Sequence, residues 1–394
     1  GEHRDLHSFP TRRSSDLGTI STSATSAYGT AYLRNTATGD ITIPIDNPTW
    51  YTSDLSSWSF GNMYINGDIT FKPDTLSMFQ INSSGDMILD SNVIVKIQGY
   101  YTTDSDGVGV YFNLAGDLVV PSTSSITGNT YGYRAGTTTS LLSGMGQGKG
   151  LGLAHNYGDQ PGGGGGYGGA GGNGASNTAG GTYGSLSAPV NLGSGGGFGN
   201  SYINTDGVGG AGGAAIKISA DEIQIDGTLT MNGGNATYIG GGGSGGSIYL
   251  LGNTLTGAGT ISATGGTGTA TAYGTGGAGG GGRLSLSFGT YSWTGSSLTT
   301  SVATAKGATG NGGSNGTVYI SPSFSSIGSS AITASGATLT GTVSNIEGGA
   351  TDRGFEYSLN SEFTSSTQVS KGASSTSGAI TTDLSGLSET TTYY

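Results

Sequence analysis

The stretch that decides the fold reads Gly212-Gly-Ala-Ala-Ile216-Lys-Ile218-Ser-Ala-Asp-Glu-Ile223-Gln-Ile225-Asp-Gly227-Thr-Leu229-Thr-Met231-Asn-Gly233-Gly234. A shift of 32 residues superposes apolar on apolar and glycine on glycine: Ile216 on Ile248, Ile218 on Leu250, Ile223 on Leu255, Leu229 on Ile261 and Gly227 on Gly259. A further shift of 36 places Ile248 on Leu284 and Gly259 on Gly295. The apolar residues alternate within each unit, which is typical of short strands with one face inward.

A fixed repeat of short strands joined by glycines is typical of a β-solenoid, in which the inward aliphatic residues stack from one coil to the next. We therefore predict an all-β chain with a parallel β-solenoid over residues 61–324, carrying glycine-rich loop insertions and followed by a partial β-sandwich over 325–394. A right-handed coil is expected from the general rule for parallel crossovers.

Composition limits the function classes. The chain has 394 residues, 81 glycines, no cysteine, 9% charged residues and a net charge of −11. Nucleic acid binding requires clustered Lys and Arg, and no such cluster is present. No apolar stretch approaches the roughly 20 residues of a transmembrane helix. Without cysteine there are neither disulfides nor thiolate metal sites, so stability is expected from stacked repeats.

The N-terminal residues need separate treatment. The string His7-Ser-Phe-Pro-Thr-Arg-Arg-Ser-Ser-Asp-Leu17 resembles the translation of a sequencing-library adapter, so residues 1–17 are interpreted as an artefact. This leaves His155 as the remaining histidine, and the absence of a signal peptide says nothing about secretion. Residues 18–60 are expected to be a lead-in or a cap, with a strand over Ile41–Ile45 and with Trp50 and Trp58 as bulky anchors.

Period-2 strands begin after Gly61. They are expected at 63–65, 69–71, 79–81, 87–89, 93–97, 110–112, 118–120 and around 126. Turns are expected at Asn66-Gly67, Ser84-Gly85, Asp106-Gly107 and Ala115-Gly116, where glycine makes a positive φ inexpensive.

The glycine-rich insert over about 144–213 is too long for an ordinary connection. We expect a loop expelled from one coil and packed through its own large side chains, Tyr167, Tyr183, Leu186, Leu192 and Phe198. Shorter versions at 240–246 and 274–282 occupy the equivalent position in the next coils, which predicts one glycine-rich flank along the solenoid. This pattern resembles the glycine-rich β-solenoid surface proteins of bacteria, a resemblance that covers about 61–321.

The C-terminal part changes in composition at Ser325. Alternating strands are expected over 337–343, 353–358, 377–380 and 384–387, as in a β-sandwich. The string Leu387-Ser-Glu-Thr-Thr391-Thr-Tyr393 resembles the tyrosine corner of fibronectin type III domains, with Glu389 in the place of the family's proline. The resemblance implies a truncated module with an exposed edge, because its last two strands would follow Tyr394.

Candidate chemistry is sparse. Asp221, Glu222 and Asp226 cluster as the acids of a polysaccharide lyase or hydrolase could, yet the latter two flank the inward Ile223 and Ile225, as solvated turn residues do. Asp104-Ser-Asp106-Gly107 could ligate calcium, but it lacks further acids and also fits a plain Asp-Gly turn.

Two further patterns are weak. Gly207-Val-Gly-Gly-Ala-Gly212 matches a dinucleotide-binding fingerprint, but a strand is expected after it where a phosphate site needs a helix. His155 has no second imidazole or triad partner nearby.

A short ladder of outward hydroxyls is predicted on successive coils, formed by Thr228/Thr230, Thr260/Ser262 and Ser297/Thr299. Such ladders can bind ice or sugar, and threonine is also a good strand former on a solvent face. We predict no catalytic, cofactor-binding or metal-binding residues.

The leading hypothesis is a non-enzymatic structural or adhesive component of a bacterial cell surface or secreted matrix, extracellular, with surface glycans or other surface proteins as partners. The alternatives are a carbohydrate- or ice-binding solenoid, and a fragment of a larger carbohydrate-active enzyme.

Overall fold

The computed structural model describes residues 20–23, 30–34, 37–43, 48–52, 59–138, 140–152, 159–175, 177–201, 207–271, 274–295, 297–299, 312–344, 351–374 and 376–394. The elements bounded in these residues are all β-strands. The chain divides into two compact units, the first ending at Tyr319 and the second formed by residues 287–290 and 320–394. Within the described ranges, no helix has the length and apolarity needed to cross a membrane.

The first unit is built from circuits of the chain, each of which contributes one strand to each of three faces. The first face contains β5 (Ser59–Phe60), β8 (Phe79–Ser83), β11 (Val110–Leu114), β14 (Ala215–Ser219), the start of β17 (Ser247–Gly257), β21 (Arg283–Trp293) and β23 (Thr317–Ile320). The second contains β3 (Ile41–Ile43), β6 (Met63–Ile65), β9 (Met87–Leu89), β12 (Leu118–Val120), β15 (Glu222–Ile225) and the end of β17. The third contains β4 (Thr49–Tyr51), β7 (Ile69–Lys72), β10 (Ile94–Ile97), β13 (Ser125–Thr127), β16 (Thr228–Thr230), β18 (Thr260–Ser262) and β22 (Ser297–Thr299).

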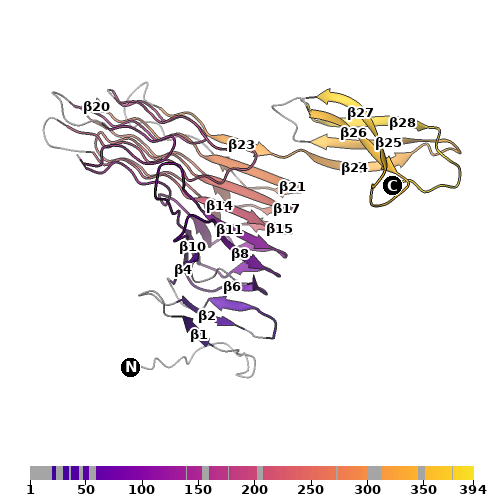
Figure 1. Cartoon of the computed structure of the whole chain (residues 1–394), viewed down its shortest axis with the longest axis horizontal. Helices are drawn as coiled ribbons and strands as arrows, with labels where there is room; N and C mark the ends of the chain where they lie inside the picture. Colours follow the sequence, from indigo (N-terminus) through magenta and orange to yellow (C-terminus); the bar gives the residue numbers. More distant parts are fainter. Residues whose placement is uncertain are drawn as a thin grey trace. The chain divides into compact units, whose positions relative to one another are not determined.

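Equivalent strands of successive circuits pair in parallel, and Figure 1 shows them lying one above another. The pairs include Ile216 with Ile248, Ile223 with Leu255, and Leu229 with Ile261, which confirms the 32-residue shift. Strand β21 lies beside β17, and Leu284 is fully buried. The aliphatic columns read from the sequence are therefore present.

The same pairing extends toward the N-terminus beyond Gly61. Strand β3 already pairs in parallel with β6, and β4 pairs with β7, so the first circuit includes residues from Ile41 onward. An antiparallel hairpin of β1 (Ile20–Ser23) and β2 (Thr30–Arg34) pairs with β3 and ends the sheet. Trp50 is fully buried among aromatic neighbours, with its ring centroid 5.6 Å from that of Phe71. Trp58 lies outside the described residues.

The predicted positive φ at the turn glycines is wrong. None of Gly67, Gly85, Gly107 and Gly116 has a positive φ. A side chain at Gly85 would instead meet Asn62 of the previous circuit, and one at Gly116 would meet Asp86. Gly85 and Gly116 are therefore required by the close approach of neighbouring circuits.

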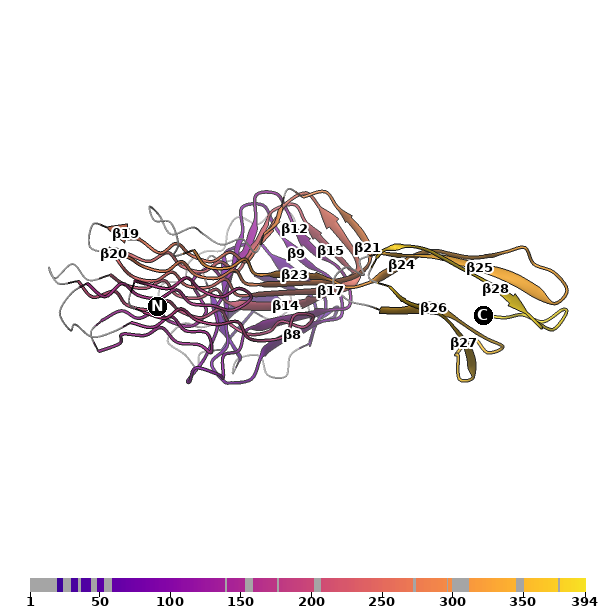
Figure 2. The same ribbon diagram turned by 90° about the horizontal axis from the view of Figure 1, so that it is seen from above.

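The glycine-rich segments are also not expelled loops, contrary to the prediction for 144–213. Between the third face and the first face of the next circuit, the chain leaves the strands and returns, as Figure 2 shows near β19 (Ala270–Thr271) and β20 (Gly274–Thr275). We call residues 128–214, 231–246 and 263–282 the glycine-rich body. It contains segments that are buried throughout, at residues 161–169, 192–200, 239–246 and 276–282.

Hydrogen bonds in the glycine-rich body repeat every three residues. Segment 162–167 shows this period. The amides of Gly162 and Gly165 donate to carbonyls of segment 239–242. The amides of residues 163 and 166 donate to carbonyls of segment 148–151, and the amides of residues 164 and 167 donate to carbonyls of segment 169–172. The amides of Gly277 and Gly280 in turn donate to residues 162 and 165. A strand bonds alternately to two sides, whereas a three-residue period is that of a polyproline II helix. The body is therefore a lattice of extended segments, each bonded to several neighbours.

The second unit contains two antiparallel sheets. One is formed by β24 (Ser323–Ser330), β25 (Gly336–Ser344) and β28 (Gly378–Ser385), the other by β26 (Thr351–Ser358) and β27 (Ser366–Ser374). Val343 and Ile380 are buried, with Phe355 packed against them. The sequence located β25 and β26. It divided β28 into two strands, and it missed the polar strands β24 and β27, whose side chains are mostly exposed.

Candidate functional site

The hydroxyl ladder on the third face has the predicted register. Thr228 pairs with Thr260, which pairs with Ser297, and the next column is formed by Thr230, Ser262 and Thr299. The structure extends the columns by one circuit, to Ser125 and Thr127, which the sequence comparison missed because the insert separates them from β16.

The predicted outward orientation holds for only part of this ladder. Thr228 is exposed, but Ser262 is buried at 6% exposure. The Thr230 hydroxyl donates to that of Thr127 (3.1 Å), and the Ser262 hydroxyl donates to the side chain of Asn232 (2.8 Å). The inner column therefore bonds largely to itself and to the glycine-rich side, which leaves the outer column as the accessible one.

The three clustered acids bind the following circuit. Asp221 accepts a hydrogen bond from the Asn253 amide group (2.6 Å), Glu222 accepts one from the Thr256 hydroxyl (2.6 Å), and Asp226 accepts one from the Ala258 backbone amide (3.1 Å). All three carboxylates thus accept donors of the circuit that follows them, as structural cross-links do.

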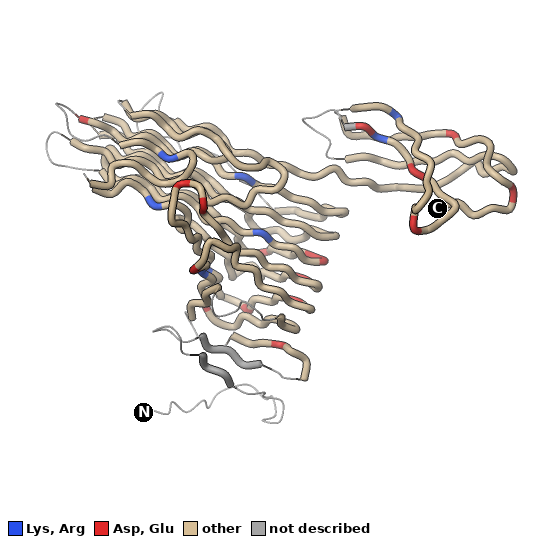
Figure 3. The backbone as a smooth tube through the Cα atoms, viewed as in Figure 1, with Lys and Arg blue, Asp and Glu red and all other residues tan. Residues whose placement is uncertain are grey.

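Glu222 also belongs to a longer column at the corner between the first and second faces. The side-chain oxygen of Asp40 accepts the amide of Asn62 (2.7 Å), Asn62 accepts that of Asp86 (2.8 Å), Asp86 accepts that of Asp117 (2.9 Å), and Asp117 accepts that of Glu222 (2.9 Å). Figure 3 shows acidic residues recurring at one edge of successive circuits. We call these five residues the acidic column. Among the described residues, no three acidic or histidine side chains are grouped so that they could hold a metal ion.

The two aspartates of the calcium hypothesis are bound to different partners. Asp104 forms an ion pair with Lys149 (2.5 Å) and accepts the amide of Gly146 (3.0 Å). Desolvation raises the pKa of the Asp106 carboxyl, but hydrogen bonds from the Thr102 hydroxyl and from the backbone amides of Thr103 and Thr102 outweigh it and lower this pKa to about 2. The structure therefore favours the turn interpretation.

Two other candidates are placed as follows. The stretch from Gly207 to Gly212 is extended backbone that leads into β14, and the amides of its four glycines bond to backbone carbonyls, as those of Gly209 and Gly212 do to Gly136 and Tyr133. These amides are not available to a phosphate. His155 lies outside the described residues.

Four of the five large side chains through which the insert was predicted to pack are buried or half-buried, and Tyr167 also connects the insert to a strand. Leu192 and Phe198 are buried, Tyr183 is half-buried, and Leu186 is exposed. Tyr167 is fully buried, and its hydroxyl is hydrogen bonded to that of Ser247 at the start of β17 (2.6 Å). Burial raises the pKa of Tyr167 to about 12, although the Ser247 hydrogen bond and the Arg283 cation oppose the shift. The site is a packed anchor and not a ligand pocket.

A group on the first face was not found from the sequence. Tyr111 of β11, Lys217 of β14 and Tyr249 of β17 are adjacent in the register and point outward between inward aliphatic residues. The Lys217 ammonium lies 4.2 Å from the ring centroid of Tyr111 and 5.5 Å from that of Tyr249. The repeat alignment contains these residues, at the positions after Val110, Ile216 and Ile248, but the prediction considered only the inward columns.

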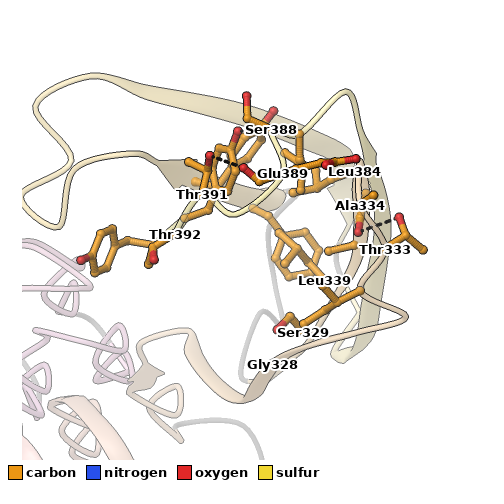
Figure 4. Close-up of a pocket in the computed structure, with 18 of the residues that line it drawn as sticks. Gly328, Ser329, Thr333, Ala334, Leu339, Leu384, Ser388, Glu389, Thr391 and Thr392 are labelled. Atoms are coloured by element: carbon orange, nitrogen blue, oxygen red, sulfur yellow. Dashed lines mark hydrogen bonds between the residues drawn. The ribbon is translucent and has the colours of Figure 1, made fainter.

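The second unit contains a groove of about 750 Å³ between its sheets. Figure 4 shows Leu339 and Leu384 lining it from one sheet, beside Glu389 and Thr391 of the C-terminal segment. Two side chains of its lining, Ile327 and Ile332, are each 73% exposed.

The C-terminal segment beside this groove has a defined backbone arrangement. The Tyr393 hydroxyl accepts the backbone amide of Ser388 (3.0 Å), and the backbones of Tyr394 and Ser358 exchange two hydrogen bonds (2.8 and 3.0 Å). Tyr394 thus pairs with the last residue of β26 through its backbone.

In comparisons with known proteins, no protein-family model, no curated protein and no solved structure matches this chain.

Proposed function

We propose that this chain is a non-enzymatic structural or adhesive component of a bacterial cell surface or secreted matrix. Its first unit is proposed to be a right-handed β-solenoid whose circuits extend sideways into the glycine-rich body. The second unit is proposed to be a partial fibronectin type III-like module, which the Tyr393 to Ser388 hydrogen bond and the position of Tyr394 on β26 support.

The observation that carries the proposal is the continuity of backbone hydrogen bonding through every circuit. Strands bond to strands in parallel ladders, and glycine-rich segments bond to several neighbours with a three-residue period. The polar side chains of the acidic column hold circuits together. Such an arrangement gives an extended, stiff body with little charge, which suits display and weak surface contacts.

The alternative of a carbohydrate- or ice-binding solenoid is supported by one observation, the outer hydroxyl column of Ser125, Thr228 and Thr260 in consecutive circuits. Substitution of both threonines by tyrosine would disrupt this column without touching the core. Loss of ice-recrystallisation inhibition or of glycan-array signal in the double variant would favour this alternative.

The proposal is tested by labelling intact cells of the source bacterium with antibodies raised against residues 18–394. We expect label on the cell surface or in the matrix. Label confined to permeabilised cells would contradict the proposal. In parallel, the purified protein is incubated with bacterial polysaccharides and their chain length is followed, since shortening of any polymer would contradict the non-enzymatic part.

A further inference from the structure

The outward side of the first face carries two columns of side chains across β8, β11, β14 and β17. The register places Gln80, Tyr111, Lys217 and Tyr249 in one column, and Asn82, Asn113, Ser219 and Leu251 in the other. These eight side chains are all exposed or half-buried. We call this set the tyrosine–lysine face.

Charge on this face is restricted to one residue. Lys217 is the only charged residue in the segments of the four strands that form it, although the chain as a whole has a net charge of −11. Its ammonium lies near the rings of Tyr111 and Tyr249 and forms no ion pair with a described carboxylate. The three N–H donors of this cation therefore remain available to a ligand anion.

The two rings and the amides beside them add a polar and aromatic surface. Neighbouring strands lie about 4.8 Å apart, so the rings of Tyr111 and Tyr249, two strands apart, are separated by about 10 Å along the stack. In the adjacent column, Asn82 accepts hydrogen bonds from the side chains of Gln80 (2.8 Å) and Asn113 (3.0 Å). These bonds orient the amides and leave the Asn82 amino group and the Gln80 carbonyl without a partner among the described residues.

We propose that the tyrosine–lysine face binds an acidic polysaccharide that runs along the stack. The apolar faces of the sugar rings pack on Tyr111 and Tyr249, a sugar carboxylate pairs with Lys217, and sugar hydroxyls bond to the free amide groups of Gln80 and Asn82. A polysaccharide with a repeated anionic group can place one of its charges at Lys217 while its sugar rings pack on Tyr111 and Tyr249 on either side. This inference rests on the proposed surface function and names the ligand class through which it would act.

The test is titration of the full chain with polygalacturonate, with dextran as a neutral chain and polyglutamate as an acidic polypeptide. We expect polygalacturonate to bind, and added salt to weaken binding because the pair is at the surface. Lys217→Gln should weaken binding about tenfold, the loss of one charge-assisted hydrogen bond, and Lys217→Arg should largely preserve it. Tyr111→Ser and Tyr249→Ser should also weaken binding.

The matched control is Lys72→Gln. Lys72 also lies over a tyrosine, 5.8 Å from the ring centroid of Tyr51, but on the third face and with no second ring among the residues that the structure describes. The Lys72→Gln variant should bind polygalacturonate as tightly as the wild type does. The proposal is overturned if polygalacturonate does not bind, if Lys217→Gln and Lys72→Gln have equal effects, or if dextran or polyglutamate binds more tightly.

The outcome is separable from that of the proposed function. Surface labelling of cells without binding of polygalacturonate would remove this inference and leave the surface role intact. If the protein binds polygalacturonate but antibodies label it only inside cells, the surface role is removed. The inference then fails as well, because it requires the protein to meet polysaccharides outside the cell.

Discussion

Glycine in this chain serves close backbone packing more than it serves turns. In the glycine-rich body, a Cβ on Gly165 would collide with the carbonyl oxygen of Ser194, and one on Gly241 would collide with that of Gly163. Neither residue has a positive φ. Glycine is therefore required there because the neighbouring segment occupies the space of a side chain, and the residue's conformational freedom is not what is used.

This difference can be tested with two single substitutions. Gly165→Ala should lower the free energy of unfolding by about 1–3 kcal/mol, the usual cost of overpacking a filled interior. Gly181→Ala is the matched control, because nothing lies within 4 Å of the position of its Cβ. Chemical denaturation of the three proteins measures the difference, and equal stability of the two variants would contradict the packing role of Gly165.

At this scale the sequence predicted the inward residues well and the glycines poorly. Ile216 and Ile248 could be aligned because an aliphatic column repeats the same residue type at a fixed spacing. The partners of Gly165 include residues 242 and 280, and glycine carries no side chain whose chemistry marks a partner. The run of glycines was consequently interpreted as a loop.

Among the elements, the second face shows how polar residues hold parallel strands in register. The acidic column places a side-chain acceptor before each of β3, β6, β9 and β12, and each acceptor binds the backbone amide at the equivalent position of the next circuit. An amide there would otherwise lie at a corner where the strand ladder is interrupted. Asn62 occupies this column among aspartates, so the acceptor oxygen matters and the charge does not.

Asp117 provides the test of this interpretation. Asp117→Ala removes the acceptor of the Glu222 amide and should cost about 1 kcal/mol of unfolding free energy. Asp117→Asn keeps an acceptor oxygen, as Asn62 does naturally, and should stay within about 0.5 kcal/mol of the wild type. Denaturant titration checks both, and a loss in Asp117→Asn equal to that in Asp117→Ala would show that the charge is what counts.

The acidic column could not be found from the sequence, although its individual residues were visible. Asp117 and Glu222 are 105 residues apart because the insert lies between them, so a search at a spacing of 32 does not join them. Local alternation with Ile223 and Ile225 fixes the outward direction of Glu222 and Asp226, but the hydrogen bonds of the three acids to the following circuit could not be read from it.

On the scale of the whole molecule, strands and glycine-rich segments alternate from β13 to β21 and are joined by hydrogen bonds such as that from Ser247 to Ala214 (3.0 Å). We therefore expect the strands and the glycine-rich body of the first unit to unfold together. The second unit has its own small core around Val343 and Ile380.

We therefore expect two unfolding transitions in calorimetry. Ile223→Ala, in the strands, should lower the midpoint of the same transition as Gly165→Ala, with a cost of about 2–5 kcal/mol for the cavity. Ile380→Ala should lower the other transition alone. A separate response of the strands and of the glycine-rich body would contradict their common unfolding.

The glycine-rich insert leaves the strands and returns to them at the same place. The amide of Ala214 donates to the carbonyl of Gly128, so the two ends of an excursion that includes residues 129–213 touch each other (2.8 Å). A chain that departs and comes back at one point can vary in contour length with only a small entropic cost per added residue. Evolution, or an engineer, could therefore add residues at an exposed part of this excursion, such as 184–188, without altering the alignment of neighbouring strands.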